Sequence, residues 1–173
     1  MDNKYKTNEE KIEYIVDTSC LLNFAKIDVD DRVFRSWKGR FAVGPAVLDQ
    51  VRRRPKESER GGEPYPLQPY IEGGYIHLID QPIAQLAPSP VDYYKLSRSI
   101  GEADTEVVLL GAANGLIVVT DDFRDIHSQM VRTMFPDLML MSTLQLLNKL
   151  VQEGVVSQQE VDRLRAILGP RHR

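Results

Sequence analysis

The sequence predicts an α/β fold, with a mostly parallel central sheet in a three-layer α/β/α sandwich. Two observations carry this prediction. Short apolar runs of strand length alternate with runs of helical periodicity along the chain, which is the pattern of repeated strand–helix–strand units. The chain has 173 residues, of which 42% are hydrophobic, so it can bury one sizeable core but is too short for two ordinary domains.

We therefore expect a single domain over residues 1–173. Residues 1–11 are charged and polar and are expected to be flexible, and residues 142–173 are expected to form C-terminal helices packed on the same domain. No run of about 18 apolar residues occurs, which predicts a soluble, cytoplasmic protein with no membrane partner. The single cysteine, Cys20, excludes an intrachain disulfide and cysteine-based zinc sites.

The first strand and helix lie near the N-terminus. Residues 13–17 read EYIVD, a short apolar run that ends on an aspartate and is typical of a buried strand. Thr18 or Ser19 can cap the helix that follows over residues 19–27.

A second strand and helix follow. Residues 40–44 (RFAVG) form an apolar strand, and Pro45 opens a helix over residues 45–54, because proline is favourable at a first helical position. Residues 55–69 are rich in proline, glycine and charge, which predicts a loop or a mobile lid.

The rest of the chain continues the alternation. A helix over residues 101–115 has acidic residues in its first turn and glycine at its end, and it passes directly into an apolar strand over residues 116–120. The other predicted elements are a strand over residues 75–80, a polar helix over residues 91–99, a last short strand over residues 138–141, and two helices over residues 143–154 and 157–168.

Carboxylates follow two of the predicted strands. Asp17 closes the first strand, and Asp121 and Asp122 follow the strand over residues 116–120. In parallel α/β sheets, ligands bind beyond the carboxyl ends of the strands. We therefore expect these carboxylates to approach one another at that edge of the sheet.

The helix over residues 101–115 offers a third carboxylate. Asp104 shares a helical face with Val107 and Val108, so it should point inward toward the sheet. Glu102 shares a face with Glu106 and should point outward or toward the rim of the site. Several inward carboxylates at one place repel one another, and a bound Mg²⁺ or Mn²⁺ is the ordinary solution.

Each carboxylate also has an ordinary structural explanation. Asp17 can be a helix cap or a turn residue. Glu102 and Asp104 can stabilise the dipole at a helix N-terminus. Asp121 with Asp122 can form a turn. Three separate parts of the chain supply carboxylates to the edge where this fold class has its active site. This coincidence favours the functional interpretation.

Positive charge is concentrated in one segment. The net charge of −3 argues against a protein that coats nucleic acid through its overall charge. Residues 52–60 nevertheless carry five basic residues against Glu57 and Glu59, a local excess of three positive charges. The segment can contact phosphates, or equally it can form a solvated helix end whose charge suits the C-terminal dipole.

Three segments, taken in order, resemble the PIN-domain family. They read IVDTSCLLNF, PAVLDQV, and GEADTEVVLLGAANG running into LIVVTDDF. The similarity spans residues 14–126, and residues 141–168 look like the C-terminal helices of small prokaryotic PIN nucleases of the VapC-toxin type. The resemblance implies a Mg²⁺- or Mn²⁺-dependent endoribonuclease, often the toxin of a toxin–antitoxin pair. It also implies RNA, an antitoxin protein and a second copy of the chain as partners.

The resemblance implies a set of metal ligands by position. Asp17 matches the family's aspartate after the first strand, and Asp104 matches its central helix acid. Asp122 matches the aspartate two places after the threonine of the last motif, which is Thr120 here. Asp125 matches a further acidic position that some members have.

Substrate contacts are implied at neighbouring positions. Thr18 and Ser19 match a small polar pair beside the first acid, where a hydroxyl can steady a carboxylate or a metal-bound water. The predicted substrate-binding residues are Thr18, Ser19, Arg52, Arg53, Arg54, Lys56 and Thr120.

One match to the family is imperfect. The helix after the second strand usually carries a glutamate, and here the aligned place falls on Asp49 or Gln50. Neighbouring helical residues point about 100° apart, so only one of them can face the site. The chemistry favours Asp49, because Gln50 would put a neutral amide in place of an anion.

These observations give a mechanistic hypothesis. A cation among Asp17, Asp104 and Asp122 lowers the pKa of a bound water and stabilises charge on the phosphate during in-line attack. In this hypothesis Asp49, Glu102 or Asp125 orients that water or holds a second ion through solvent.

Three alternatives compete with this hypothesis. A receiver-like signalling domain would need paired acids at the first strand and a lysine near the last, where Ser142 and Thr143 stand. A haloacid-dehalogenase-like phosphatase would need an aspartate at the place of Ser19. The stronger alternative is a catalytically weak or inactive PIN scaffold that binds RNA or a protein partner.

Overall fold

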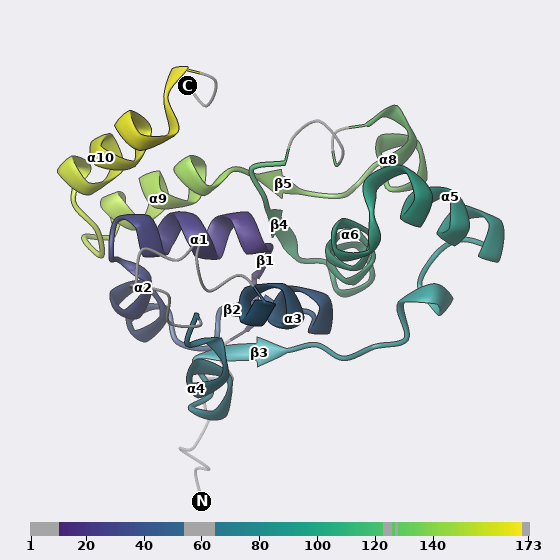
Figure 1. The fold of residues 1–173 in the computed structure, drawn as a ribbon, viewed down its shortest axis with the longest axis horizontal. Helices are drawn as coiled ribbons and strands as arrows, with labels where there is room; N and C mark the ends of the chain where they lie inside the picture. The colour runs from purple at the N-terminus through teal and green to yellow at the C-terminus, as the bar shows by residue number, and fades with distance from the viewer. Residues whose placement is uncertain (1–10, 54–64, 123–125, 127, 171–173) are drawn as a thin grey trace, which may run out of the picture.

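A computed structural model of the chain describes residues 11–53, 65–122, 126 and 128–170. The described residues form an α/β protein around a five-stranded sheet (Figure 1). The strands are β1 (Tyr14–Val16), β2 (Phe41–Val43), β3 (Ile76–Leu78), β4 (Ile117–Val119) and β5 (Leu140–Met141). Their spatial order is β3-β2-β1-β4-β5, and all four pairings are parallel. The predicted α/β fold class is confirmed.

Helices fill the connections between the strands. They are α1 (Thr18–Lys26) and α2 (Asp30–Ser36) after β1, α3 (Pro45–Arg53) and α4 (Leu67–Glu72) after β2, the 3-10 turn η1 (Ile83–Gln85) with α5 (Pro90–Ile100) and α6 (Glu102–Asn114) after β3, α8 (Gln129–Met134) after β4, and α9 (Thr143–Gln152) with α10 (Gln158–Leu168) after β5. In the part of the chain described above, none of the helices has the length and apolar character needed to cross a membrane.

Three short helices were not predicted. Helices α2 and α8 are only seven and six residues long, too short for a clear apolar period. Helix α4 lies at the edge of the proline-rich segment, and its Pro69 is tolerated because it stands in the first turn. Most of the loop predicted over residues 55–69, and nearly all of the flexible segment predicted over residues 1–11, lie outside the described residues.

The strand order reverses beside β1. From β1 the chain moves outward in one direction to β2 and β3, and it then crosses to β4 and β5 on the other side. Such a reversal separates the connecting segments at the carboxyl end of the sheet and leaves room for a ligand there. The end of β1 and the end of β4 therefore define the expected binding edge.

The core explains why α6 does not look amphipathic. Every residue from Thr105 to Gly111 is buried, because α6 packs on β1 and β4 on one side and against α3 and α5 on others. The C-terminal helices belong to the same core, since Leu146 and Leu150 of α9 and Leu164 of α10 are fully buried in the main apolar cluster.

An ion pair between Arg32 of α2 and Glu160 of α10 connects the two helices. The Arg32 guanidinium donates to both Glu160 carboxylate oxygens, at 3.0 and 2.7 Å. These hydrogen bonds lower the pKa of Glu160 from 4.5 to about 2. Glu160 is also the third residue of the Ser157 capping box of α10.

We expect Glu160→Gln to lower stability only where the ion pair is ionised. Glutamine can still complete the capping box, so the substitution removes mainly the charge. Because the folded-state pKa lies below the unfolded one, the stabilisation is complete above pH 4.5 and is lost as the pH falls toward about 2. Both side chains are partly exposed, so the loss at pH 7 should be roughly 0.5–1 kcal/mol. Urea unfolding of wild type and variant at pH 7 and pH 2 measures this loss. An equal loss in free energy of unfolding at both pH values would contradict the ion-pair explanation.

Candidate functional site

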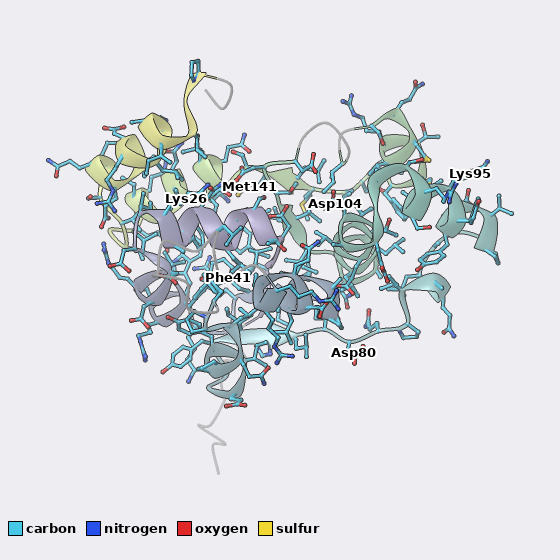
Figure 2. The ribbon with its side chains drawn as sticks, viewed as in Figure 1. Lys26, Phe41, Asp80, Lys95, Asp104 and Met141 are labelled. Atoms are coloured by element: carbon cyan, nitrogen blue, oxygen red, sulfur yellow. The ribbon has the colours of Figure 1, made fainter. Side chains whose placement is uncertain are left out.

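A cavity of about 260 Å³ opens at the binding edge, between the ends of β1 and β4. Three aspartates from three elements line it: Asp17 follows β1, Asp122 follows β4, and Asp104 lies in the first turn of α6, where Figure 2 labels it. The rest of the wall consists of Thr18, Ser19, Leu22, Val47, Gln50, Ala103 and Val107. We call this space the aspartate cavity.

Asp17 is held by a dense set of hydrogen bonds. Its Oδ1 accepts from the Ser19 hydroxyl at 2.6 Å and from the Cys20 backbone N–H at 2.9 Å, and its Oδ2 accepts from the Thr120 hydroxyl at 2.5 Å. Three of the roughly four acceptor positions of the carboxylate are thus occupied, and one remains on Oδ2. The bond to Cys20 makes Asp17 the N-cap of α1, which corrects the prediction that Thr18 or Ser19 caps this helix.

Burial raises the pKa of Asp17, which is only 5% exposed. The hydrogen bonds from Ser19, Thr120 and Cys20 lower it in part, and the neighbouring Asp121 raises it further. A cation at the open position of Oδ2 would offset the cost of burying this charge. Since a metal binds the ionised form, we expect acid to weaken metal binding earlier than at an ordinary aspartate.

Two hydroxyl groups tie the ends of β1 and β4 together. Thr120 donates to Asp17 and accepts from the Asp122 backbone N–H at 3.1 Å. Ser19 donates to Asp17 and accepts from the Asp121 backbone N–H at 3.2 Å. Thr120 is completely buried and is not part of the cavity wall, so the prediction that it binds substrate is wrong. Its position makes it a positioning residue for two of the aspartates.

The adjacent residues Asp121 and Asp122 have different surroundings. The Asp121 carboxylate accepts from the backbone N–H and the hydroxyl of Thr143, at 2.9 and 2.5 Å, and from the Asn23 amide at 2.6 Å. It therefore joins the start of α9 to α1. Asp122 lines the aspartate cavity, and its role as a metal ligand stays a prediction.

The structure places Gln50 in the aspartate cavity and leaves Asp49 outside it. The Thr18 hydroxyl donates to Gln50 Oε1 at 2.5 Å, which fixes the amide at the wall. Asp49 is exposed and pairs with Arg53 one helical turn along, at 3.1 Å. Asp49 therefore does not line the aspartate cavity but the hollow next to it, and its role in the site stays a prediction.

A second hollow of about 590 Å³ adjoins the cavity and shares Gln50 and Ala103 with its wall. Glu102 is exposed and lines this hollow, consistent with its predicted place at the rim. The other residues around it are Pro45, Ala46, Asp49, Arg53 and Glu106.

Glu106 is a buried carboxylate that the helical pattern assigned to the outward face. Its Oε1 accepts from the Ala46 backbone N–H at 2.9 Å, so it caps the start of α3, where Gly44 and Pro45 offer no capping side chain. Burial raises its pKa, and the backbone N–H groups of Ala46 and Val47 oppose that shift. The missing cap before Pro45 was the only signal in the sequence for this role.

We expect Gly44→Ala to disrupt the hydrogen bond between Glu106 and the Ala46 backbone N–H. A Cβ at Gly44 would overlap the Glu106 carboxylate and lie 2.9 Å from Leu110 Cδ1. Displacing Glu106 would uncap α3, so the free energy of unfolding should fall by about 1–3 kcal/mol. Urea denaturation measures it, and in a Glu106→Ala background the same substitution should cost less. Wild-type stability of the single variant would argue against the close approach.

The structure describes Arg52 and Arg53 among the predicted basic residues of this segment. Arg52 does not line the aspartate cavity and donates to Gln68 Oε1 of α4 at 2.9 Å; its assignment to substrate stays a prediction. Arg53 lines the second hollow. Arg54 and Lys56, like Asp125, lie outside the described residues.

The donors around the aspartate cavity suit a hard divalent cation. They are carboxylate, hydroxyl and amide oxygens, which Mg²⁺ and Mn²⁺ prefer. Within the described ranges, no three acidic, histidine or cysteine side chains are close enough to form a complete cage for a metal. Mg²⁺ commonly keeps several waters and binds through one or two carboxylates. The residues present thus fit a hydrated ion, with Asp17, Asp104 and Asp122 as the groups that would hold it.

The parallel sheet with aspartates at its switch point belongs to the α/β class, and the fold is that of a PIN domain. The structure of a DNA-bound VapBC from Salmonella typhimurium is similar, with a TM-score of 0.50 and 16% identity over 77% of this chain and 99% of that chain. PAE2754 from Pyrobaculum aerophilum is similar too, with a TM-score of 0.50 and 15% identity over 82% of this chain and 96% of that chain. No protein-family model and no curated protein sequence matches the chain. The resemblance to PIN domains is thus confirmed for the fold.

Proposed function

We propose that the protein is an endoribonuclease that hydrolyses RNA phosphodiester bonds with Mg²⁺ or Mn²⁺. One observation carries the proposal: aspartates from β1, β4 and α6 line a single cavity at the switch point of the sheet. Carboxylate oxygens are the ligands that Mg²⁺ and Mn²⁺ prefer, and these three carboxylates share one cavity.

The residues of the cavity have separate tasks in this proposal. Asp17, Asp104 and Asp122 hold the cation, and the chemistry supplied when it is bound is a water of lowered pKa and stabilisation of charge on the phosphate. Thr120 and Ser19 fix the orientation of Asp17 through their hydroxyl groups. In this proposal Glu102, which is exposed and lines the adjoining hollow, accepts a proton from an approaching water.

The direct test is cleavage of single-stranded RNA by the purified full chain. We expect cleavage with Mg²⁺ or Mn²⁺, none with EDTA, and recovery when the metal is restored. Calorimetry with Mn²⁺ alone measures binding independently of activity. Absence of both binding and cleavage would reject the proposal.

Gln50 favours a second candidate function, a PIN scaffold that binds RNA or a protein without cutting. It puts a neutral amide where the family usually has an acid, and this weakens attraction for a cation. Mn²⁺ binding together with RNA binding, but with no cleavage over long incubation, would favour the scaffold.

We also propose that the protein acts as the toxin of a toxin–antitoxin pair. The support is that one similar structure is that of a DNA-bound VapBC. An adjacent reading frame for a short DNA-binding protein, and co-purification of the two products, would be expected. Homodimer formation stays a prediction, to be measured by sedimentation.

A further inference from the structure

Gln50 of α3 lies at the boundary between the aspartate cavity and the second hollow. It is one of two residues that line both spaces, and the other is Ala103 of α6, which has no polar side-chain atom. The Gln50 side chain is partly exposed. A ligand in either space therefore lies next to the Gln50 amide, which is the polar side-chain group that the two spaces share.

The Gln50 amide is held by Thr18. The Thr18 hydroxyl donates to Gln50 Oε1 at 2.5 Å, and Thr18 is the first residue of α1 and only 8% exposed. A side-chain amide has one acceptor oxygen and one NH₂ group with two donors. Because Oε1 is bound to Thr18, the NH₂ group is the free arm of the amide, and within the described part of the chain it donates to no protein atom. Two N–H donors are thus available to a ligand.

The charge of the cavity favours the same orientation of the amide. Three aspartates line the cavity together with Gln50. Ionised carboxylates only accept hydrogen bonds, and they repel the partial negative charge of an amide oxygen but attract an N–H group. Both preferences are met when Oε1 turns to Thr18 and the NH₂ group turns to the acidic space.

An NH₂ group binds an anion and not a cation. The amide nitrogen offers no acceptor site, so Gln50 in this orientation is not a metal ligand. The non-bridging oxygens of a phosphodiester are negatively charged acceptors, and side-chain amides are among the groups that contact them in nucleic-acid complexes. The wall thus offers two kinds of group at one place, carboxylates for a cation and an amide donor for a phosphate.

We propose that Gln50 donates a hydrogen bond from Nε2 to a non-bridging oxygen of the phosphodiester at the aspartate cavity, and that Thr18 is the positioning residue that fixes the amide for this contact. The inference deepens the proposed function and rests on it for the class of substrate. It gives position 50 a role in binding phosphate, in place of the acidic role that the resemblance implies there.

The test is binding of a dinucleoside phosphorothioate, which has one phosphorus centre and requires no cleavage. Its two stereoisomers, with sulfur at one or the other non-bridging position, are each titrated with the full chain and Mn²⁺ by calorimetry. Sulfur is a weak hydrogen-bond acceptor. The ratio of the two affinities should therefore differ about fivefold between wild type and Gln50→Ala, because the variant lacks the donor. An unchanged ratio, or no binding of either isomer to wild type, would overturn the proposal.

The role of Thr18 is tested by Thr18→Val, which removes the hydroxyl, and by Thr18→Ser, which keeps it. Thr18→Val should change the isomer ratio in the same direction as Gln50→Ala, whereas Thr18→Ser should keep the ratio within about twofold of wild type. In the Gln50→Ala background, Thr18→Val should have no further effect on the ratio. An effect that persists without the amide would overturn the positioning role of Thr18.

The opposite orientation of the amide predicts a different result. With Oε1 toward the cation, Gln50 would be a metal ligand, so Gln50→Ala would weaken Mn²⁺ binding without nucleotide and leave the isomer ratio unchanged. The proposal predicts a changed ratio and a Mn²⁺ affinity within about twofold of wild type.

Gln68→Ala is the matched control, because it removes an amide from α4. Gln68 is bound to Arg52 and Glu72 and lines neither of the two spaces that share Gln50. The control should change neither the isomer ratio nor the Mn²⁺ affinity, and a change as large as that in Gln50→Ala would overturn the proposal. Thermal unfolding checks that every variant is folded.

The outcome is separable from that of the proposed function. An isomer ratio that depends on Gln50, in a protein that never cleaves unmodified RNA, supports the phosphate contact and rejects hydrolysis. Cleavage of RNA with an isomer ratio that does not depend on Gln50 supports hydrolysis and rejects the contact.

Discussion

Asp17→Asn is expected to reduce metal-dependent RNA cleavage by about 10²–10³-fold while the protein stays folded. Asparagine has nearly the same shape, and its oxygen can still accept a hydrogen bond, but it removes the charge that a cation needs. Loss of one anionic ligand removes several kcal/mol of charge stabilisation from metal and transition state. Asp104→Asn and Asp122→Asn should act similarly, since both line the same cavity.

The measurement combines initial cleavage rates with Mn²⁺ calorimetry and thermal unfolding. Thermal unfolding without metal checks that the variant is folded, since asparagine relieves the buried charge of Asp17 but its amide nitrogen cannot accept the hydrogen bond that one carboxylate oxygen accepts. Asp49→Asn is the matched control, since Asp49 is an acid that lies just outside the cavity and pairs with Arg53. We expect it to bind Mn²⁺ like wild type. Full cleavage activity in both Asp17→Asn and Asp122→Asn would contradict the proposal that these aspartates bind a catalytic cation.

The strands and their binding edge were predictable because they depend on local patterns. Residues 13–17 and 116–120 are apolar runs that each end in polar residues, and parallel strands place those ends at one edge. The approach of Asp17, Asp104 and Asp122 follows from that topology and from the inward face of α6. These features required no knowledge of side-chain packing.

Features that depend on side-chain packing could not be predicted from the sequence pattern. Glu106 was assigned to the outward face because a helix with one buried stripe was assumed, whereas α6 is buried on all sides. Thr120 carries a hydroxyl beside the site, yet only the structure shows that it is buried and bonded to Asp17. Arg52 and Arg53 differ in rotation around α3, and only the structure shows that Arg52 contacts Gln68 whereas Arg53 lines the second hollow.

The same rotation decides between Asp49 and Gln50, and it leads to the second large prediction. Gln50→Glu should raise Mn²⁺ affinity at least tenfold, because it adds a fourth carboxylate to the aspartate cavity. The new carboxylate can keep the hydrogen bond from Thr18, so the wall need not rearrange. Without metal the added repulsion should lower the free energy of unfolding of Gln50→Glu by about 1–2 kcal/mol below that of wild type. With saturating Mn²⁺ the variant should become the more stable of the two proteins.

Calorimetry and urea unfolding, each with and without Mn²⁺, measure both effects. Gln68→Glu is the control, because it makes the same substitution on α4 beside Arg52 and away from the cavity. It should leave Mn²⁺ affinity unchanged. If Gln50→Glu binds Mn²⁺ no more tightly than wild type, Gln50 does not face the ion. If the wild type binds RNA without cutting it and Gln50→Glu cuts, the neutral amide at position 50 is what separates a scaffold from a nuclease in this chain.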